Sequence, residues 1–126
     1  MRRNPLPKSK DNEPIQFIDQ VNRNEDLSGV DLRNANLKGS DFTGCSFRNA
    51  DLTGAILVDC NLTNCDFTGA TLDKASLVGA TVKGAIFDNC SVNGTMLFDL
   101  EKLVSTEVFE PTSIEKLGGF VINKSV

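Results

Sequence analysis

The most constraining feature of this sequence is a bulky apolar residue at every fifth position through its central part. That spacing matches neither the 3.6-residue period of an α-helix nor the two-residue alternation of a β-strand. It predicts a backbone that turns a corner every five residues and directs one large side chain inward in each segment. The uninterrupted series is Leu27, Leu32, Leu37, Phe42, Phe47, Leu52, Leu57, Leu62, Phe67, Leu72, Leu77, Val82, Phe87, Val92 and Leu97.

The residues around each bulky position follow a pattern that suits a corner. The residue two positions before is small, the two direct neighbours are mostly polar, and the residue two positions after is commonly Gly, Asn or Asp, as in residues 50–54. Gly and Asn supply the backbone freedom that a tight turn requires. We therefore expect small and bulky side chains to fill a narrow interior together, while the polar neighbours face water.

This pattern, A(D/N)LXX over residues 25–99, resembles that of the pentapeptide-repeat family. The resemblance implies an all-β fold, namely a right-handed quadrilateral parallel β-helix with four quintets per coil and just under four coils. Residues 20 apart would then stack on one face, which places Phe47, Phe67 and Phe87 in one column of aromatic rings. Because solenoids need their open ends covered, we expect short helical caps at one or both ends.

The chain divides into four predicted segments. Residues 1–12 contain two prolines among polar and charged residues, and we expect a disordered basic tail there. Residues 13–24 are expected to form an N-terminal cap, either a short helix or an extended strap, below the β-helix of residues 25–99. Residues 100–126 are expected to form a C-terminal helical cap and a tail that packs on the solenoid, with the apolar stretch 120–122 lying against it.

The composition argues against several catalytic and metal-binding chemistries. The chain has no His, and its four cysteines are Cys45, Cys60, Cys65 and Cys90, each at the small position of a quintet. We interpret them as reduced, small apolar fillers, because no CxxC or Cys/His group is present to bind zinc. No nucleophile is paired with a base in the sequence pattern. We therefore predict that the protein is not an enzyme and takes no cofactor or metal.

Charge and hydropathy limit the classes of partner. The net charge of −4 is too small to indicate a nucleic-acid partner by itself. The longest apolar run, residues 55–58, is too short to cross a bilayer, and no apolar stretch of secretory length follows the basic N-terminus. We therefore expect a cytoplasmic protein with no direct nucleic-acid binding and no membrane association.

One of the four predicted faces is apolar on its outer side. The face centred on Leu37, Leu57, Leu77 and Leu97 directs outward the side chains of Ile56, Val58, Val78, Met96 and Phe98. Soluble monomers seldom leave such a patch bare. Two explanations stay open: the chain's own C-terminal tail covers the patch, or a protein partner does, including a second copy in a homodimer formed through the C-terminal segment.

These observations predict a non-catalytic protein-interaction or scaffold module, whose partner the sequence does not identify. The alternative is a DNA mimic that inhibits or protects a type II topoisomerase such as gyrase, a role that the family resemblance implies for long acidic rods. The repeat segment is only mildly acidic, because Arg33, Lys38, Arg48, Lys74 and Lys83 interrupt its negative charge.

Overall fold

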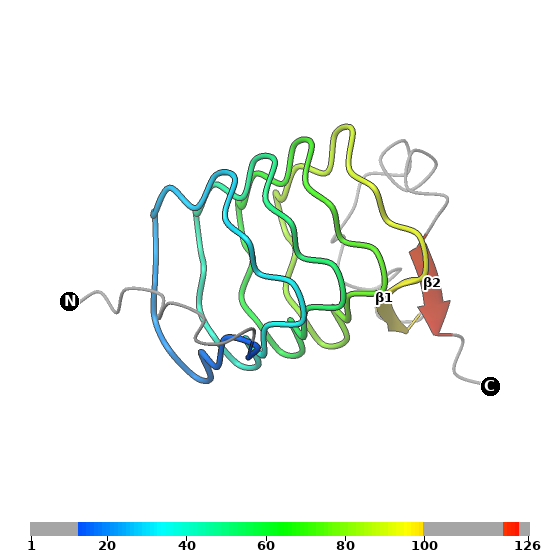
Figure 1. Cartoon of the computed structure of the whole chain (residues 1–126), viewed down its shortest axis with the longest axis horizontal. Coiled ribbons are helices and arrows are strands. Elements are labelled where there is room, and N and C mark those ends of the chain that lie inside the picture. Colours follow the sequence, from blue (N-terminus) through cyan, green and yellow to red (C-terminus); the bar gives the residue numbers. More distant parts are fainter. Residues whose placement is uncertain (1–12, 100–119, 124–126) are drawn as a thin grey trace.

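The computed structural model describes the backbone of residues 13–99 and 120–123 and the side chains of residues 13–96. The chain winds into a four-sided spiral whose coils stack along one axis (Figure 1). Parallel β-bridges join residues 20 positions apart, from the pair Gln16–Asn36 to the pair Ser76–Met96. The predicted parallel β-helix with four quintets per coil is therefore confirmed over the described part of the repeat.

Regular strands are rare in the described residues because a corner follows each short straight segment. Each side of a coil contributes one bridged residue, and a turn begins two residues later. The exceptions are β1 (Thr95–Asp99) and β2 (Phe120–Asn123), which pair in parallel at the C-terminal end of the spiral (Figure 1). Outside these two strands, backbone hydrogen bonds join each coil to the next. For example, the Leu52 amide donates to the Thr71 carbonyl at 2.7 Å.

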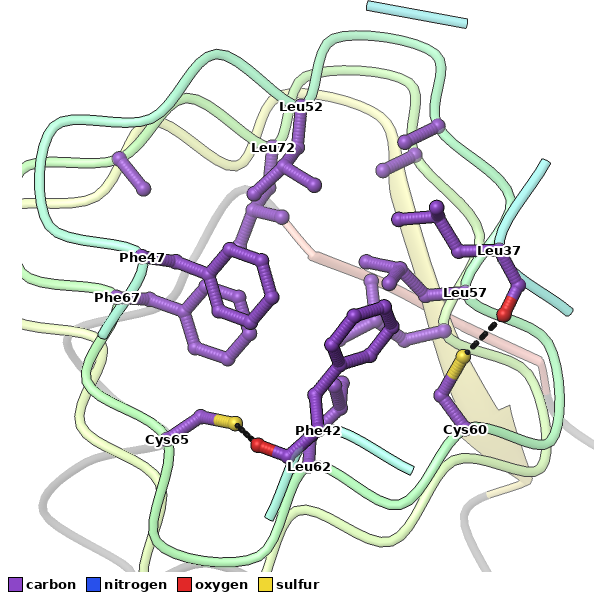
Figure 2. Close-up of a cluster of buried hydrophobic side chains, with 14 of the residues drawn as sticks. Leu37, Phe42, Phe47, Leu52, Leu57, Cys60, Leu62, Cys65, Phe67 and Leu72 are labelled. Atoms are coloured by element: carbon purple, nitrogen blue, oxygen red, sulfur yellow. Dashed lines mark hydrogen bonds between the residues drawn. The ribbon is translucent and has the colours of Figure 1, made fainter. Parts of the chain in front are cut away.

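The predicted bulky residues fill the interior. Every central side chain from Leu32 to Val82 is fully buried. The rings of Phe47 and Phe67 stack with centroids 5.0 Å apart, and those of Phe67 and Phe87 with centroids 5.1 Å apart, with planes within 5° of parallel. Figure 2 shows Phe47 directly over Phe67. The predicted phenylalanine column is therefore confirmed.

Residues 13–24, which we expected to form a separate cap, continue the spiral instead. Gln16 pairs with Asn36 at the same offset as the later rungs, and Phe17 is a buried central residue. The segment contains no helix. The sequence pattern does not extend into this segment, because Asn22 occupies the next central position and is buried there, where the pattern expects a bulky apolar residue.

The C-terminal segment is described only at residues 120–123. The predicted helical cap falls within residues 100–119, and the predicted disordered tail is residues 1–12; both lie outside the described residues. The apolar stretch 120–122 belongs to β2, in which Phe120 pairs with Thr95 and Val121 with Met96. This stretch therefore adds a strand to the last coil, on the face that carries β1.

Each corner is built around a residue with left-handed backbone, and side chains alternate there from coil to coil. Asn49, Gly69 and Asn89 stack in one corner with φ angles of 60°, 72° and 57°. The Asn49 Oδ1 occupies the place that a Cβ on Gly69 would need. An Asn or Asp side chain at a corner therefore excludes a side chain at the same corner of the next coil. The corner columns are Asp19–Gly39–Asp59–Gly79, Asn24–Gly44–Asn64–Gly84, Gly29–Asn49–Gly69–Asn89 and Asn34–Gly54–Lys74–Gly94.

The corner alternation predicts different costs for the same substitution at two glycines. Gly29 and Gly69 have φ angles of 71° and 72°, but only Gly69 has a side chain, that of Asn49, where a Cβ would stand. We expect Gly29→Ala to lower the free energy of unfolding by about 1–2 kcal/mol through backbone strain alone. Gly69→Ala should cost about 1–3 kcal/mol more through the steric overlap.

Denaturant melts of the two variants measure this difference. Adding Asn49→Gly to Gly69→Ala should recover the extra loss, because it removes the overlapping oxygen. Equal losses for Gly29→Ala and Gly69→Ala would show that the side chain of the coil below does not restrict the corner.

The aromatic column predicts a large cost for truncating its middle ring. Phe67→Ala should lower the free energy of unfolding by about 3–5 kcal/mol, because it leaves a cavity between the stacked rings of Phe47 and Phe87. Ile86→Ala, at a side chain that is 44% exposed, is the surface control and should cost less than about 1 kcal/mol. A loss of that small size at Phe67 would contradict the interior described above.

Candidate functional site

One face of the spiral carries a concentration of exposed apolar side chains. Ile56 and Met96 belong to one bridged column of outward residues, and Val58 and Val78 occupy the outward position after the central residue of the same face. Ile56 is 38% exposed, and the other three are partly exposed. We call these four residues the apolar wall. Phe98, the fifth predicted member, lies on β1, and its side chain is outside the described part of the chain.

The face that carries the apolar wall holds further apolar residues that the sequence analysis did not include. Ile18 occupies the position of Val58 in the first coil and is 40% exposed, with Lys38 between the two. Ile18 directly follows the central residue Phe17, just as Val58 directly follows Leu57. This position in the quintet could have predicted that Ile18 faces outward. At the other end, the register of β2 places Val121 beside Met96.

The two corners that border the apolar wall carry opposite charges. Asp59 directly follows Val58 on one edge, and Lys74 lies two residues before Ser76 on the other edge. Both are exposed residues with left-handed backbone, at φ angles of 59° and 61°. Within the described residues, neither forms an ion pair. The wall is thus an apolar strip with an anionic and a cationic edge.

The outward carboxylates of the other faces are engaged in local bonds. The Asp66 Oδ1 accepts hydrogen bonds from the Thr68 amide and hydroxyl, and its Oδ2 accepts one from Arg48 at 2.9 Å. Burial alone would raise the pKa of Asp66, but these bonds outweigh it and lower the pKa. Hydrogen bonds from Arg33 likewise lower the pKa of Asp31 to about 2. These carboxylates therefore stabilise turns and neutralise arginines.

The small position of each quintet accommodates hydrogen-bond donors as well as alanine. The Cys60 thiol donates to the Leu37 carbonyl at 2.9 Å, and the Cys65 thiol donates to the Phe42 carbonyl at 3.0 Å (Figure 2). The buried hydroxyl of Ser40 makes the equivalent bond. Our interpretation of the cysteines as apolar fillers was therefore incomplete, because each thiol also satisfies a buried carbonyl.

The cysteines show no sign of a nucleophilic role. Burial raises the pKa of Cys45 to about 11 and those of Cys60 and Cys90 to about 12, and it raises the pKa of Cys65 further still. The protonated thiol, which is the poor nucleophile, therefore prevails at neutral pH. All four are free cysteines.

Two kinds of feature are absent from the described residues. They contain no group of three or more His, Cys, Asp or Glu side chains arranged to hold a metal ion. Nor does a helix with the length and apolar character needed to span a bilayer occur among them. Ile86 is a single exposed apolar side chain on another face, whereas the face of the apolar wall carries several.

Comparison with known families matches the repeat segment. The family model described as Pentapeptide repeats matches residues 26–64 and 65–98, with 8 copies. No curated protein matches the chain.

Several solved structures are similar to this chain. A pentapeptide repeat protein from the thylakoid lumen of Arabidopsis thaliana is 28% identical with a TM-score of 0.59, over 65% of this chain and 54% of that one. HetL, a pentapeptide repeat protein involved in heterocyst differentiation regulation from the cyanobacterium Nostoc sp. strain PCC 7120, is 28% identical with a TM-score of 0.39, over 65% and 40%. QnrB1, a plasmid-mediated fluoroquinolone resistance protein, is 21% identical with a TM-score of 0.37, over 67% and 70%. The chain thus spans about half the length of the thylakoid-lumen protein.

The raised thiol pKa values predict a loss of stability at alkaline pH. The unfolded chain releases its thiol protons near the ordinary pKa of 9.0, while the folded chain retains those of Cys60 and Cys65 to higher pH. The contribution of these thiols is therefore fully present below about pH 8.5 and is lost as the pH rises above it.

Denaturant melts between pH 7 and pH 10.5 test this dependence. The double variant Cys60→Ala/Cys65→Ala should show a shallower fall in unfolding free energy with pH than the wild type. The comparison uses slopes, since the variant also loses two hydrogen bonds at every pH. Equal slopes would contradict the assigned burial of the thiols.

Proposed function

Since this chain belongs to the pentapeptide-repeat family, we propose that it is a non-catalytic protein-binding module that engages another polypeptide through the apolar wall. The observation that carries the proposal is the concentration of exposed apolar side chains on one of four faces. Ile56 is 38% exposed, and Val58 stands beside it on the same rung. Water contact with such a contiguous group is unfavourable, and burial against another polypeptide removes it.

The rest of the described molecule supports a rigid docking platform. Central side chains from Leu32 to Val82 leave no exposed interior surface, and no buried side-chain nitrogen or oxygen in the described residues lacks a hydrogen-bond partner. Backbone bonds link each coil to the next along the repeat. A surface held in this way binds with little ordering cost, because its residues are fixed before the partner arrives.

The alternative of a DNA mimic acting on a type II topoisomerase has less support. Imitation of a nucleic-acid duplex requires regularly spaced negative charge that is not neutralised. On the polar faces, Arg23, Arg33 and Arg48 each pair with an aspartate at 2.6–2.9 Å. A supercoiling assay with purified gyrase decides this alternative, which fails if micromolar protein neither inhibits nor protects the enzyme.

Site-specific photo-crosslinking tests the proposed binding through the apolar wall. A benzoylphenylalanine introduced in place of Val58 should form an adduct with another polypeptide in an extract of cells that produce the chain. The matched control is the same replacement at Thr63, which has the same quintet position and is also partly exposed, but on a polar face. It should yield no adduct. Adding Val78→Asp should reduce the adduct formed at position 58 about fivefold or more, because it places a charge in the contact.

Three results would contradict the proposal. The first is no adduct at position 58, and the second is equal yield at position 63. The third is a crosslink confined within one chain, which would mean that the protein's own C-terminal segment covers the wall.

A further inference from the structure

We propose that the polypeptide bound by the apolar wall is a second copy of this chain, in a dimer whose two-fold axis runs parallel to the axis of the spiral. This inference rests on the proposed function, since it names the partner for the same surface. Its basis is the opposite charge on the two edges of the wall, Asp59 on one and Lys74 on the other.

A rotation about an axis parallel to the spiral brings the two edges into register. It turns the walls face to face and sets the Asp59 edge of one copy against the Lys74 edge of the other, twice by symmetry. Coils rise by about 4.8 Å for every 20 residues, so Asp59 and the partner's Lys74 differ in height by only about 4 Å. A lysine side chain spans that offset, and each copy supplies one acid and one base.

The same rotation keeps each rung opposite its own copy. Ile56 and Val58 of one chain then meet the same apolar rung of the other, and the polar rung of Asn36 and Lys38 meets a polar rung. A two-fold axis across the strip would instead place the acidic edges of the two copies together, where their charges repel. The edge charges therefore select the parallel axis, and that axis also matches each apolar rung with its own copy.

Both edge charges are available for this contact. Neither Asp59 nor Lys74 forms a contact ion pair within the described residues, although Arg23, Arg33 and Arg48 do. The charge of Lys74 acts on the adjacent Asp73, where it helps to lower the carboxyl pKa, but no salt bridge holds the lysine there. An ion pair between two chains would satisfy both groups at each edge.

The size of the wall sets the strength of the dimer. The whole face that carries the wall has five described rungs, from Gln16 to Met96, and extends about 19 Å along the axis; the three extended residues between its corners make it about 10 Å wide. The contact is therefore smaller than the roughly 800 Å² per partner of a stable interface. The dimer is consequently weak, reversible and concentration-dependent.

Charge exchange at the two edges tests the inference by sedimentation of the full chain. Asp59→Lys and Lys74→Asp each oppose like charges at both edges, and each should weaken the dimer about tenfold or more. Both changes suit the corner, because aspartate and lysine already occupy this position with left-handed backbone. Asn49→Lys, at a corner away from the wall, is the control and should leave the dissociation constant within about twofold.

An equimolar mixture of the Asp59→Lys and Lys74→Asp chains should form a dimer of nearly wild-type affinity, since each variant then presents the charges that the other lacks. The double variant should likewise recover self-association. A general loss of folding would produce neither recovery, and circular dichroism of each variant checks the fold directly.

A wild-type chain that stays monomeric at millimolar concentration would overturn the inference, as would single variants that associate normally or a mixture that does not associate. A crosslink from position 58 to a different protein, with a monomeric wild type, would overturn the second copy as partner and leave the proposed function standing. Failure of both measurements would overturn both.

Discussion

A left-handed backbone residue at every fifth position is the constraint on which the rest of this structure depends. It turns the chain so sharply that residues 20 apart meet in a parallel ladder. Once the ladder forms, the central residue of each quintet has only the interior to enter, and its polar neighbours have only the outer faces. The same turns stack the corners and so produce the alternation of Asn49, Gly69 and Asn89, because two side chains do not fit one above the other. Core, faces and corners all follow from one backbone conformation.

The interior was predictable because its chemistry repeats with the turn. A bulky residue at each central position led directly to the stack of Phe47 on Phe67. The N-terminal start was not predictable from that rule, since Asn22 fills a central position near the open end without being apolar. The hydrogen bond from Cys60 to the Leu37 carbonyl was missed for another reason: it joins residues 23 apart, whose proximity only the coiled geometry reveals.

The sequence predicted which apolar residues form the candidate site, but it did not predict the charged residues at its edges. The outward position of Ile56 and Val58 follows from their place in the quintet, and the structure puts them on one face. The edges depend on which corner columns border that face. Asp59 and Lys74 are 15 residues apart in sequence and belong to different sides of the spiral, so only the assembled coil shows that they bound one strip with opposite charges.

The apolar wall lacks local hydrogen bonds that residues at the same quintet positions make on other rungs and faces. On the same face, the Asn36 side chain accepts the Lys38 amide at 3.3 Å, and on another face Asp51 accepts both the amide and the hydroxyl of Thr53. Ile56 has no acceptor to offer the Val58 amide, so this rung forgoes a contribution of about 0.5–1.5 kcal/mol for each bond. Nothing in the turn requires that loss, since the quintet pattern folds equally well with polar residues there. An apolar rung at this position therefore forgoes a local bond that the isolated coil could make, and burial against another polypeptide, as we propose, would offset that loss.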